Sequence, residues 1–333
     1  MVNSLIPPII AAESSGNFVA LDVGTQHWIL LGVVVMILLA IDLFRHRDDH
    51  EPSLREALFE STIWVACGLA FAGYVFVVFG DQAFAEYLSG YLIEKALSVD
   101  NVFVWSMLFT SMAIPLKYQH RVLFYGIFGA LVLRGIFIFL GAALLEQFKF
   151  LLVVFGLFLI VTGLRVIRHT EDEGDTSSSA AVKFLERFVP VSETFDGHKF
   201  MTRINGHRVA TPLLAALVVV EFTDLVFAVD SVPAILAVSK EEFLVFSSNA
   251  FAILGLRAMY FLLADAKERF HYLNHGLGAI LVFVGLKMAA TWWDYHLNVW
   301  ISLSIIAALL AGAILFSERK NRRLQQEPVE AEL

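Results

Sequence analysis

Apolar residues gather in nine long runs along this chain, and short polar connections separate most of them. Each run approaches or exceeds the roughly 17–25 residues that an α-helix needs to cross a bilayer. Backbone N–H and C=O groups in lipid must be paired internally, which favours helices over open sheets. The pattern therefore predicts about nine transmembrane helices, over residues 27–44, 61–79, 87–113, 121–145, 148–167, 211–238, 243–264, 274–291 and 297–317.

The composition agrees with this pattern. Hydrophobic residues make up 58% of the chain and charged residues 17%, against about 25% charged residues in soluble domains. We therefore predict an all-α polytopic membrane protein with the lipid bilayer as its surroundings. The net charge of -8 comes without a long basic stretch, so no nucleic-acid partner is expected. The single cysteine, Cys67, excludes an intrachain disulfide framework and a CxxC redox pair.

Lysine and arginine are distributed unequally between the connections. With the N-terminus outside, the inner connections carry 18 of these residues and the outer ones only Lys149 and Lys240. Cytoplasmic loops carry the excess of positive charge, which predicts the N-terminus outside and the C-terminus in the cytoplasm. The expected parts are an extracytoplasmic segment (1–26), a transmembrane domain (27–317), a cytoplasmic loop (168–210) and a cytoplasmic tail (318–333). The polar stretch 169–210 indicates a solvated connector, with a short amphipathic helix over 182–191; a protein partner there is conceivable but unsupported.

Two acidic stretches interrupt apolar segments near their middle. Glu94 is followed by Asp100 six residues later, and Asp224 by Asp230 at the same spacing. Ionised carboxylates at that depth are costly unless they are paired or coordinated. Two such stretches indicate a functional site, and a site rich in carboxylates indicates a cation.

The two halves of the chain resemble each other beyond these acids. Leu133-Arg134-Gly135 matches Leu256-Arg257-Ala258, and Gly163-Leu164-Arg165 matches Gly285-Leu286-Lys287. The third to fifth spans, residues 87–167, therefore repeat as the sixth to eighth, residues 211–291. Because three is odd, the two repeats have opposite orientations in the membrane. This inverted topology is typical of secondary transporters, which bind their substrate near the midplane.

The candidate ligands are all hard oxygen donors, without thiolate or imidazole. They favour Mn²⁺, Mg²⁺ or Ca²⁺ over zinc or copper(I) and leave the choice among these three open. The candidate metal ligands are Glu94, Asp100, Asn101, Glu221, Asp224, Asp230 and Ser231. We expect Lys95, Arg134 and Arg257 to be their charge partners, and Asp42 and Asn249 are candidate gate residues, although Asp42 could equally be an interfacial residue.

The spacing of the acids leaves their geometry open. On a continuous helix, residues six apart point in different directions. The acids of each stretch converge if the helix is unwound between them, or else they serve different neighbours. Asn101, Ser231 and Pro233 favour local irregularity. The alternative to a cation site is that the acids form only buried ion pairs with Arg134 and Arg257.

Four segments resemble the TerC family of membrane proteins and, within it, the Alx-type bacterial members. They are Gly90–Lys95, Ser98–Phe103, Phe227–Ala234 and Asn249–Phe261, within a resemblance that spans residues 25 to 317. The resemblance implies a bacterial inner-membrane protein related to the LysE-type transporter superfamily. It also implies links to manganese efflux, to tellurium resistance and to alkaline-pH responses. Tellurite is an anion that a carboxylate cluster repels, so an indirect link to tellurium is expected.

We therefore expect a proton-coupled transporter that exports a divalent cation, with Mn²⁺ as the transported substrate and no organic cofactor. An alternative in another class is a membrane scaffold with a bound metal, which helps exported proteins to acquire metal or to insert. Enzymatic activity is not expected, because the chain has neither an HExxH motif nor a nucleophile motif.

Overall fold

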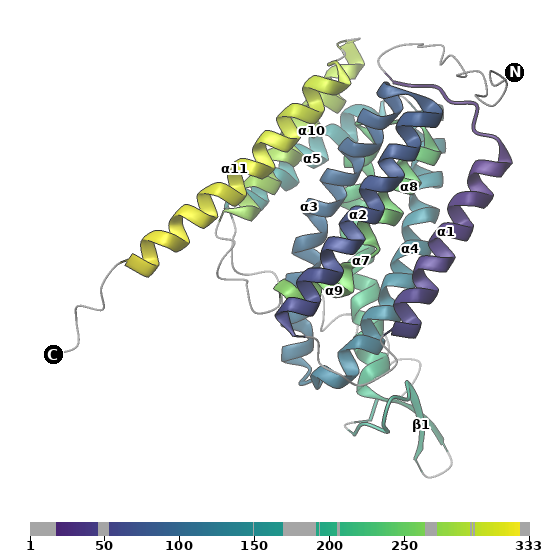
Figure 1. The fold of residues 1–333 in the computed structure, drawn as a ribbon, viewed down its shortest axis with the longest axis vertical. Coiled ribbons are helices and arrows are strands. Elements are labelled where there is room, and N and C mark those ends of the chain that lie inside the picture. Colours follow the sequence, from purple (N-terminus) through teal and green to yellow (C-terminus); the bar gives the residue numbers. More distant parts are fainter. Residues whose placement is uncertain are drawn as a thin grey trace, which may run out of the picture.

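The computed structural model describes most of the chain as a bundle of long helices (Figure 1). The described residues are 18–45, 53–148, 150–168, 191–192, 194–204, 207–263, 272–293, 295 and 297–326. Within these ranges the side chains of Asp100 and Asp230, among others, lie outside the description. The predicted amphipathic helix over 182–191 falls almost entirely outside the described residues.

The helices follow the apolar runs of the sequence closely. They are α1 (Thr25–Arg45), α2 (Leu54–Phe79), α3 (Asp81–Ser111), α4 (Leu116–Gln147), α5 (Leu151–Arg168), α7 (Pro212–Leu236), α8 (Glu242–Ile253), α9 (Leu256–Leu263), α10 (Leu273–Ala290) and α11 (Val299–Gln326). Eight segments are long and apolar enough to cross a membrane, with α8 and α9 counted together. The 31-residue α3, which carries the acids of the first stretch, is the predicted span that these eight do not include. The all-α polytopic fold is confirmed.

Several helices extend beyond their apolar runs because polar residues support their ends. Helix α2 begins at Leu54 rather than near residue 61. Ser53 and Glu56 form a capping box there, in which each side chain accepts a hydrogen bond from the other residue's backbone N–H. Helix α11 continues past residue 317 into the predicted tail, where Glu318 and Arg322 form an ion pair one turn apart.

Neither acidic stretch is unwound in the described backbone. Helix α3 runs without interruption through residues 94–101, and α7 runs through 224–231 with Pro233 inside it. The interruption lies instead between α8 and α9, where Gly255 adopts a φ of 85° against the side chain of Trp64. Glycine tolerates this left-handed conformation, whereas other residues are strained in it.

The helix contacts follow the symmetry that an inverted repeat requires. Helix α3 of the first repeat corresponds to α7 of the second, and α4 corresponds to α8. Helix α3 packs on α8 and α4 packs on α7, so the two contacts are equivalent. Helices α5 and α10 pack on each other through glycines. A Cβ at Gly156 would lie 2.7 Å from the carbonyl oxygen of Gly285, and a Cβ at Gly163 would lie 2.6 Å from that of Gly278. Gly156 corresponds to Gly278, and Gly163 to Gly285, at the 122-residue offset between the repeats. The two contacts are therefore equivalent.

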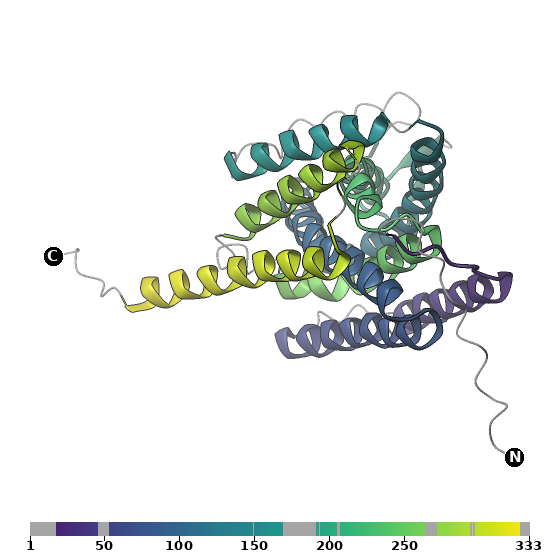
Figure 2. The same cartoon turned by 90° about the horizontal axis from the view of Figure 1, so that it is seen from above.

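The two ends of the bundle are distinct (Figures 1 and 2). At one end, residues 18–24 run without regular structure across the helix ends before α1 begins; we call this segment the strap and this end the strap end. At the opposite end, β1 (Met201–Ile204) and β2 (His207–Ala210) pair antiparallel, with Met201 opposite Ala210. We call it the hairpin end. The hairpin was not predicted from the sequence.

Apolar side chains cover the outside of the bundle. Ile29, Val77 and Leu157 are 61%, 78% and 59% exposed on α1, α2 and α5. Such exposure is unfavourable in water but suits contact with lipid chains. The polar residues discussed below lie inside this apolar shell.

Candidate cation site

Arg134 occupies the middle of the bundle, where helices of both repeats meet. Its guanidinium forms a close ion pair with Glu94 of α3 through Nη1 and Oε1. It also forms a two-pronged contact with Asp224 of α7, at 3.1 Å from Nη2 to Oδ1 and 3.3 Å from Nε to Oδ2. All three side chains are at most 1% exposed. Two buried carboxylates, one from each repeat, thus share one arginine.

Two further predicted residues contact this arginine. Ser231 Oγ lies 3.3 Å from Nη1 of Arg134. The amide of Asn101 is satisfied at both ends when its oxygen accepts from Arg134 Nη2 at 3.1 Å and its nitrogen donates to the carbonyl of Leu97 at 3.3 Å. The structure therefore brings together Glu94, Asn101, Asp224 and Ser231 of the predicted ligands around Arg134.

Some buried oxygens in this region have no hydrogen-bond partner among the described residues. Oε2 of Glu94 is one of them, and Oγ of Ser98, one turn further along α3, is another. Buried polar atoms are nearly always paired in native proteins, so unpaired ones need an explanation. Hard oxygen donors of this kind fit a divalent cation. Ser98 was not among the predicted ligands, although it lies within the first acidic stretch.

A small cavity of about 70 Å³ adjoins the cluster. Its polar wall consists of Asn101, Arg134, Ser231 and Thr162, and apolar residues of α3, α5, α7 and α10 form the rest. Thr162 and Val166 belong to the half of α5 nearer the hairpin end, and Leu277 and Leu281 to the same half of α10. On α7 the lining residues, Phe227 and Ser231, lie in the half nearer the strap end. The cavity is large enough for an ion with a water molecule.

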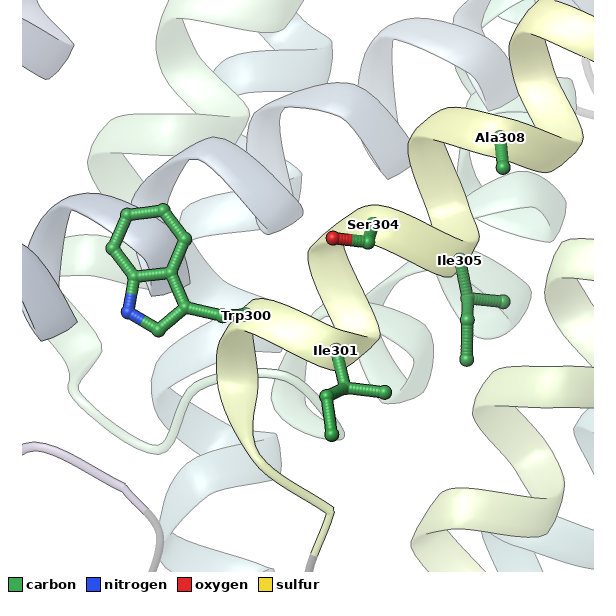
Figure 3. Close-up of a pocket in the computed structure, with 5 residues that line it drawn as sticks. All are labelled: Trp300, Ile301, Ser304, Ile305 and Ala308. Atoms are coloured by element: carbon green, nitrogen blue, oxygen red, sulfur yellow. The ribbon is translucent and has the colours of Figure 1, made fainter.

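A larger hollow of about 360 Å³ lies along α11 (Figure 3) and is a poor candidate for an ion site. Trp300, Ile301, Ser304, Ile305 and Ala308 line it, without a charged group. Its position on the outside of the bundle and its apolar lining suit lipid.

Glu221 lies one turn from Asp224 on α7, in the direction of the hairpin end. Its carboxylate packs so closely against Gly129 of α4 that a Cβ at position 129 would overlap it. Oε2 of Glu221 is buried without a partner among the described residues. The side chain is half-buried and close to the central cluster but is not in contact with Arg134 in the described structure. Glycine at 129 is therefore what makes room for this acid.

The other predicted charge partners contact different groups. Arg257 donates to the carboxylate of Asp42 in α1 at 2.5 Å and to its carbonyl at 3.0 Å. Lys95 donates to the carbonyl of Ala252 at 3.2 Å, in the last turn of α8. The break after α8 explains this difference, since α9 directs Arg257 toward α1 while the unbroken α4 brings Arg134 to the centre. Asn249, the other candidate gate residue, is buried in α8 and its Nδ2 is unpaired within the described part.

Asp100 and Asp230 remain predictions, because their side chains lie outside the description. Among the described side chains, no three His, Cys, Asp or Glu residues gather as metal ligands do. The described site thus consists of two carboxylates, one amide, one hydroxyl and an arginine.

A comparison with known proteins agrees with this architecture. The profile of the integral membrane protein TerC family matches residues 79–325, which include the whole Arg134 cluster. The chain belongs to the TerC family. The match begins at the end of α2, so Asp42 and α1 lie outside the segment that defines TerC membership.

Similar sequences extend this relationship to nearly the whole chain. An uncharacterized membrane protein of Myxococcus xanthus, STKORF319, is 46% identical over 300 residues, which cover 90% of this chain and 93% of that protein. A protein of Escherichia coli K12, whose name proposes a membrane-bound redox modulator, Alx, is 44% identical over 306 residues, or 89% and 95% of the two chains. A membrane protein of Rickettsia bellii is 37% identical over 299 residues, 88% and 98% of the two. No solved structure matches this TerC chain.

Proposed function

We propose that this TerC-family protein is a secondary transporter that exports a divalent cation from the cytoplasm, with Mn²⁺ as its substrate and protons as the coupling ion. The observation that carries the proposal is the Arg134 cluster. Two carboxylates from opposite repeats meet at the middle of the bundle beside a cavity, and one buried oxygen of Glu94 has no partner among the described residues. Apolar packing would serve stability better than a buried ion pair, which favours a functional reason for these charges.

Arg134 and the transported cation are expected to exclude each other. A guanidinium carries a permanent positive charge and has no acceptor, so it cannot ligate a metal ion itself and it repels one that the same carboxylates hold. In the structure Arg134 neutralises part of the charge on Glu94 and Asp224. We infer that the cation displaces this arginine from at least one carboxylate when it binds. After release, Arg134 returns, and the site can change its orientation without an uncompensated buried charge.

Proton coupling follows from the same carboxylates. A proton neutralises a buried carboxylate as an arginine or a metal ion does, and desolvation favours that neutral form. Protons that arrive from one side therefore compete with the cation that arrives from the other. Glu221 extends the series of acids from the centre toward the hairpin end, which the predicted orientation places in the cytoplasm. We propose that Glu221 receives the cation on its way to the central cluster.

Two repeats of opposite orientation supply the movement that such exchange requires. In inverted-repeat transporters one repeat rocks against the other around a fixed central site. Here the contacts between α3 and α8 and between α4 and α7 join the two repeats on either side of the cluster. We place the protein in a bacterial inner membrane, with the strap end outside.

The name of the Alx relatives suggests an effect on redox state. Cys67 is the single cysteine of this chain and is half-buried, so a dithiol reaction within one copy is excluded. Export of a redox-active cation would affect cellular redox state without such chemistry. The metal-bound scaffold is the second candidate function, supported by the buried and largely closed position of the cluster.

Transport of Mn²⁺ into everted membrane vesicles under an imposed pH gradient tests the proposal. We expect gradient-dependent uptake by the wild type and its loss in Glu94→Gln and Asp224→Asn, with the same outcome for Asp100→Asn and Asp230→Asn. Glu318→Gln is the matched control, because this exposed acid of α11 pairs only with its own helix in the described structure. Equal uptake in all correctly inserted variants would reject transport through this site and favour the scaffold.

A further inference from the structure

The strap at residues 18–24 binds the bundle through buried and charged groups rather than lying loosely on it. The backbone N–H of Val19 donates to Glu86 Oε1 at 2.7 Å, and that of Leu21 donates to Glu241 Oε2 at 3.2 Å. Val19 is 4% exposed and Glu86 only 1%. The ring of Phe18 lies between two lysines, with Lys240 Nζ at 5.2 Å and Lys287 Nζ at 5.5 Å from its centre. The strap is thus fixed to α3, α10 and the turn between α7 and α8.

Glu86 connects the two repeats at this end. It belongs to α3 in the first repeat, and its Oε2 accepts a hydrogen bond from Ser239 at 2.7 Å. Ser239 lies in the turn between α7 and α8 of the second repeat, where it also accepts from the N–H of Glu241 at 3.2 Å. The same carboxylate therefore binds the strap through one oxygen and the opposite repeat through the other.

Glu86 lies on the same side of α3 as the central cluster. Residues 86, 90, 94, 97 and 101 follow the i, i+4 and i+3 spacing that places them on one face of a helix. Eight residues separate Glu86 from Glu94, a rise of about 12 Å along the axis. Gly90 lies halfway, where a Cβ would come within 2.7 Å of Ser248 Oγ and 3.3 Å of Ile235 Cγ2. Between Glu94 and the strap end, α3 is therefore closely packed at Gly90, and the buried acid Glu86 lies beyond it, beneath the strap.

On the other side of the cluster, the cavity beside Arg134 takes its α5 and α10 lining from the halves of these helices nearer the hairpin end. Close packing therefore separates the central cluster from the strap end. In a transporter whose repeats rock against each other, the contacts on the closed side must separate before the substrate can leave. The contacts that join the repeats there include the Gly90–Ser248 packing and the hydrogen bond between Ser239 and Glu86.

We propose that Glu86 is a gating residue of the transport path and that the strap holds this gate closed. The role of Glu86 in transport rests on the proposed function. The opening of the gate can be measured separately, without a transport assay. Opening would separate Ser239 from Glu86 and release the strap's N–H groups, and it would expose the Gly90–Ser248 contact to water at the strap end. Glu86 acts through the position of α3 and need not touch the substrate.

Cysteine labelling at Ser248 tests the gate directly. Ser248 is 1% exposed, and the change to cysteine is nearly isosteric; Cys67→Ser removes the native thiol. A membrane-impermeant thiol reagent is added to sealed vesicles of each orientation. We expect slow labelling from the strap side with Glu86 intact and a rate about tenfold or more higher in Glu86→Ala, because hydrogen bonds to a charged group are lost. Ser239→Ala, a milder change, should raise the rate in the same direction.

Asp81→Ala is the control on the same helix, because this exposed acid accepts only from the backbone N–H of Gln82 in the described structure; it should change the rate by less than about twofold. Equal, slow labelling in every variant would overturn the gate, and if the wild type still transports Mn²⁺ the proposed function would stand. Faster labelling in Glu86→Ala and Ser239→Ala, in a protein that moves no Mn²⁺, would support the gate and reject the proposed transport.

Discussion

At the scale of single residues, the acids and their charge partner Arg134 could be predicted, whereas the partner of Arg257 could not. Glu94 and Asp224 are recognisable because a carboxylate within an apolar run has no inexpensive structural role. Arg134 and Arg257 occupy matching positions in the two repeats, and sequence treats them alike. Only packing distinguishes them, since Arg134 binds Glu94 and Asp224 whereas Arg257 binds Asp42. Hydrogen bonds of Glu86 to a distant backbone N–H leave no local pattern in the sequence, so this residue was missed.

Replacement of Arg134 by methionine is expected to destabilise the protein strongly. Glu94 and Asp224 would keep their buried positions without the cation that pairs them, and breaking a buried pair by removing one partner costs about 3–5 kcal/mol. Thermal unfolding in detergent would measure the loss. Adding Glu94→Gln to Arg134→Met removes one uncompensated charge and should restore part of the stability. Unchanged stability in Arg134→Met would show that the ion pairs are not formed in the membrane.

At the scale of elements, the apolar runs located the helices because length and hydropathy are properties of local sequence. The predicted helices are too short where polar residues continue a helix beyond its apolar run, as after Ser53 in α2 and in the last turns of α11. The break between α8 and α9 was missed for another reason. Gly255 lies inside an apolar run that reads as continuous, and its conformation depends on contact with Trp64 of α2. A tertiary contact of this kind cannot be read from one segment.

The glycines between α5 and α10 offer a test of the repeat symmetry. Gly156→Ala and Gly278→Ala occupy equivalent positions, and each new methyl group would meet backbone of the partner helix, at 2.7 and 2.6 Å respectively. Overpacking of a tight contact costs about 1–3 kcal/mol, and symmetry predicts similar losses for both variants. Gly73→Ala is the control, since nothing lies within 4 Å of the added carbon; in a helix it should be neutral or stabilising. Unfolding in detergent measures all three.

At the scale of the whole molecule, the inverted repeat connects the sequence to a mechanism. The order of matched motifs gave the three-helix unit, and the odd number of spans gave the opposite orientations. The structure adds which helices of the two repeats contact each other, and it shows close packing between the central cluster and the strap end. The distribution of charge predicts that the strap end lies outside, because that end has few basic connections while the hairpin end carries most of the lysines and arginines. Export through the proposed gate requires this orientation, since the gate must then lie on the outer side of the central cluster.

Two exposed positions on opposite ends test the orientation. In a Cys67→Ser background, Asn298→Cys lies between α10 and α11 at the strap end, and Lys199→Cys lies beside the hairpin with a side chain that is 68% exposed. An impermeant thiol reagent applied to intact spheroplasts should label the cysteine at 298 and leave that at 199 unlabelled until the membrane is permeabilised. The reverse pattern would place the strap end, and with it the gate, in the cytoplasm. The same carboxylates and gate would then serve uptake rather than export, so the direction of transport depends on this one assignment.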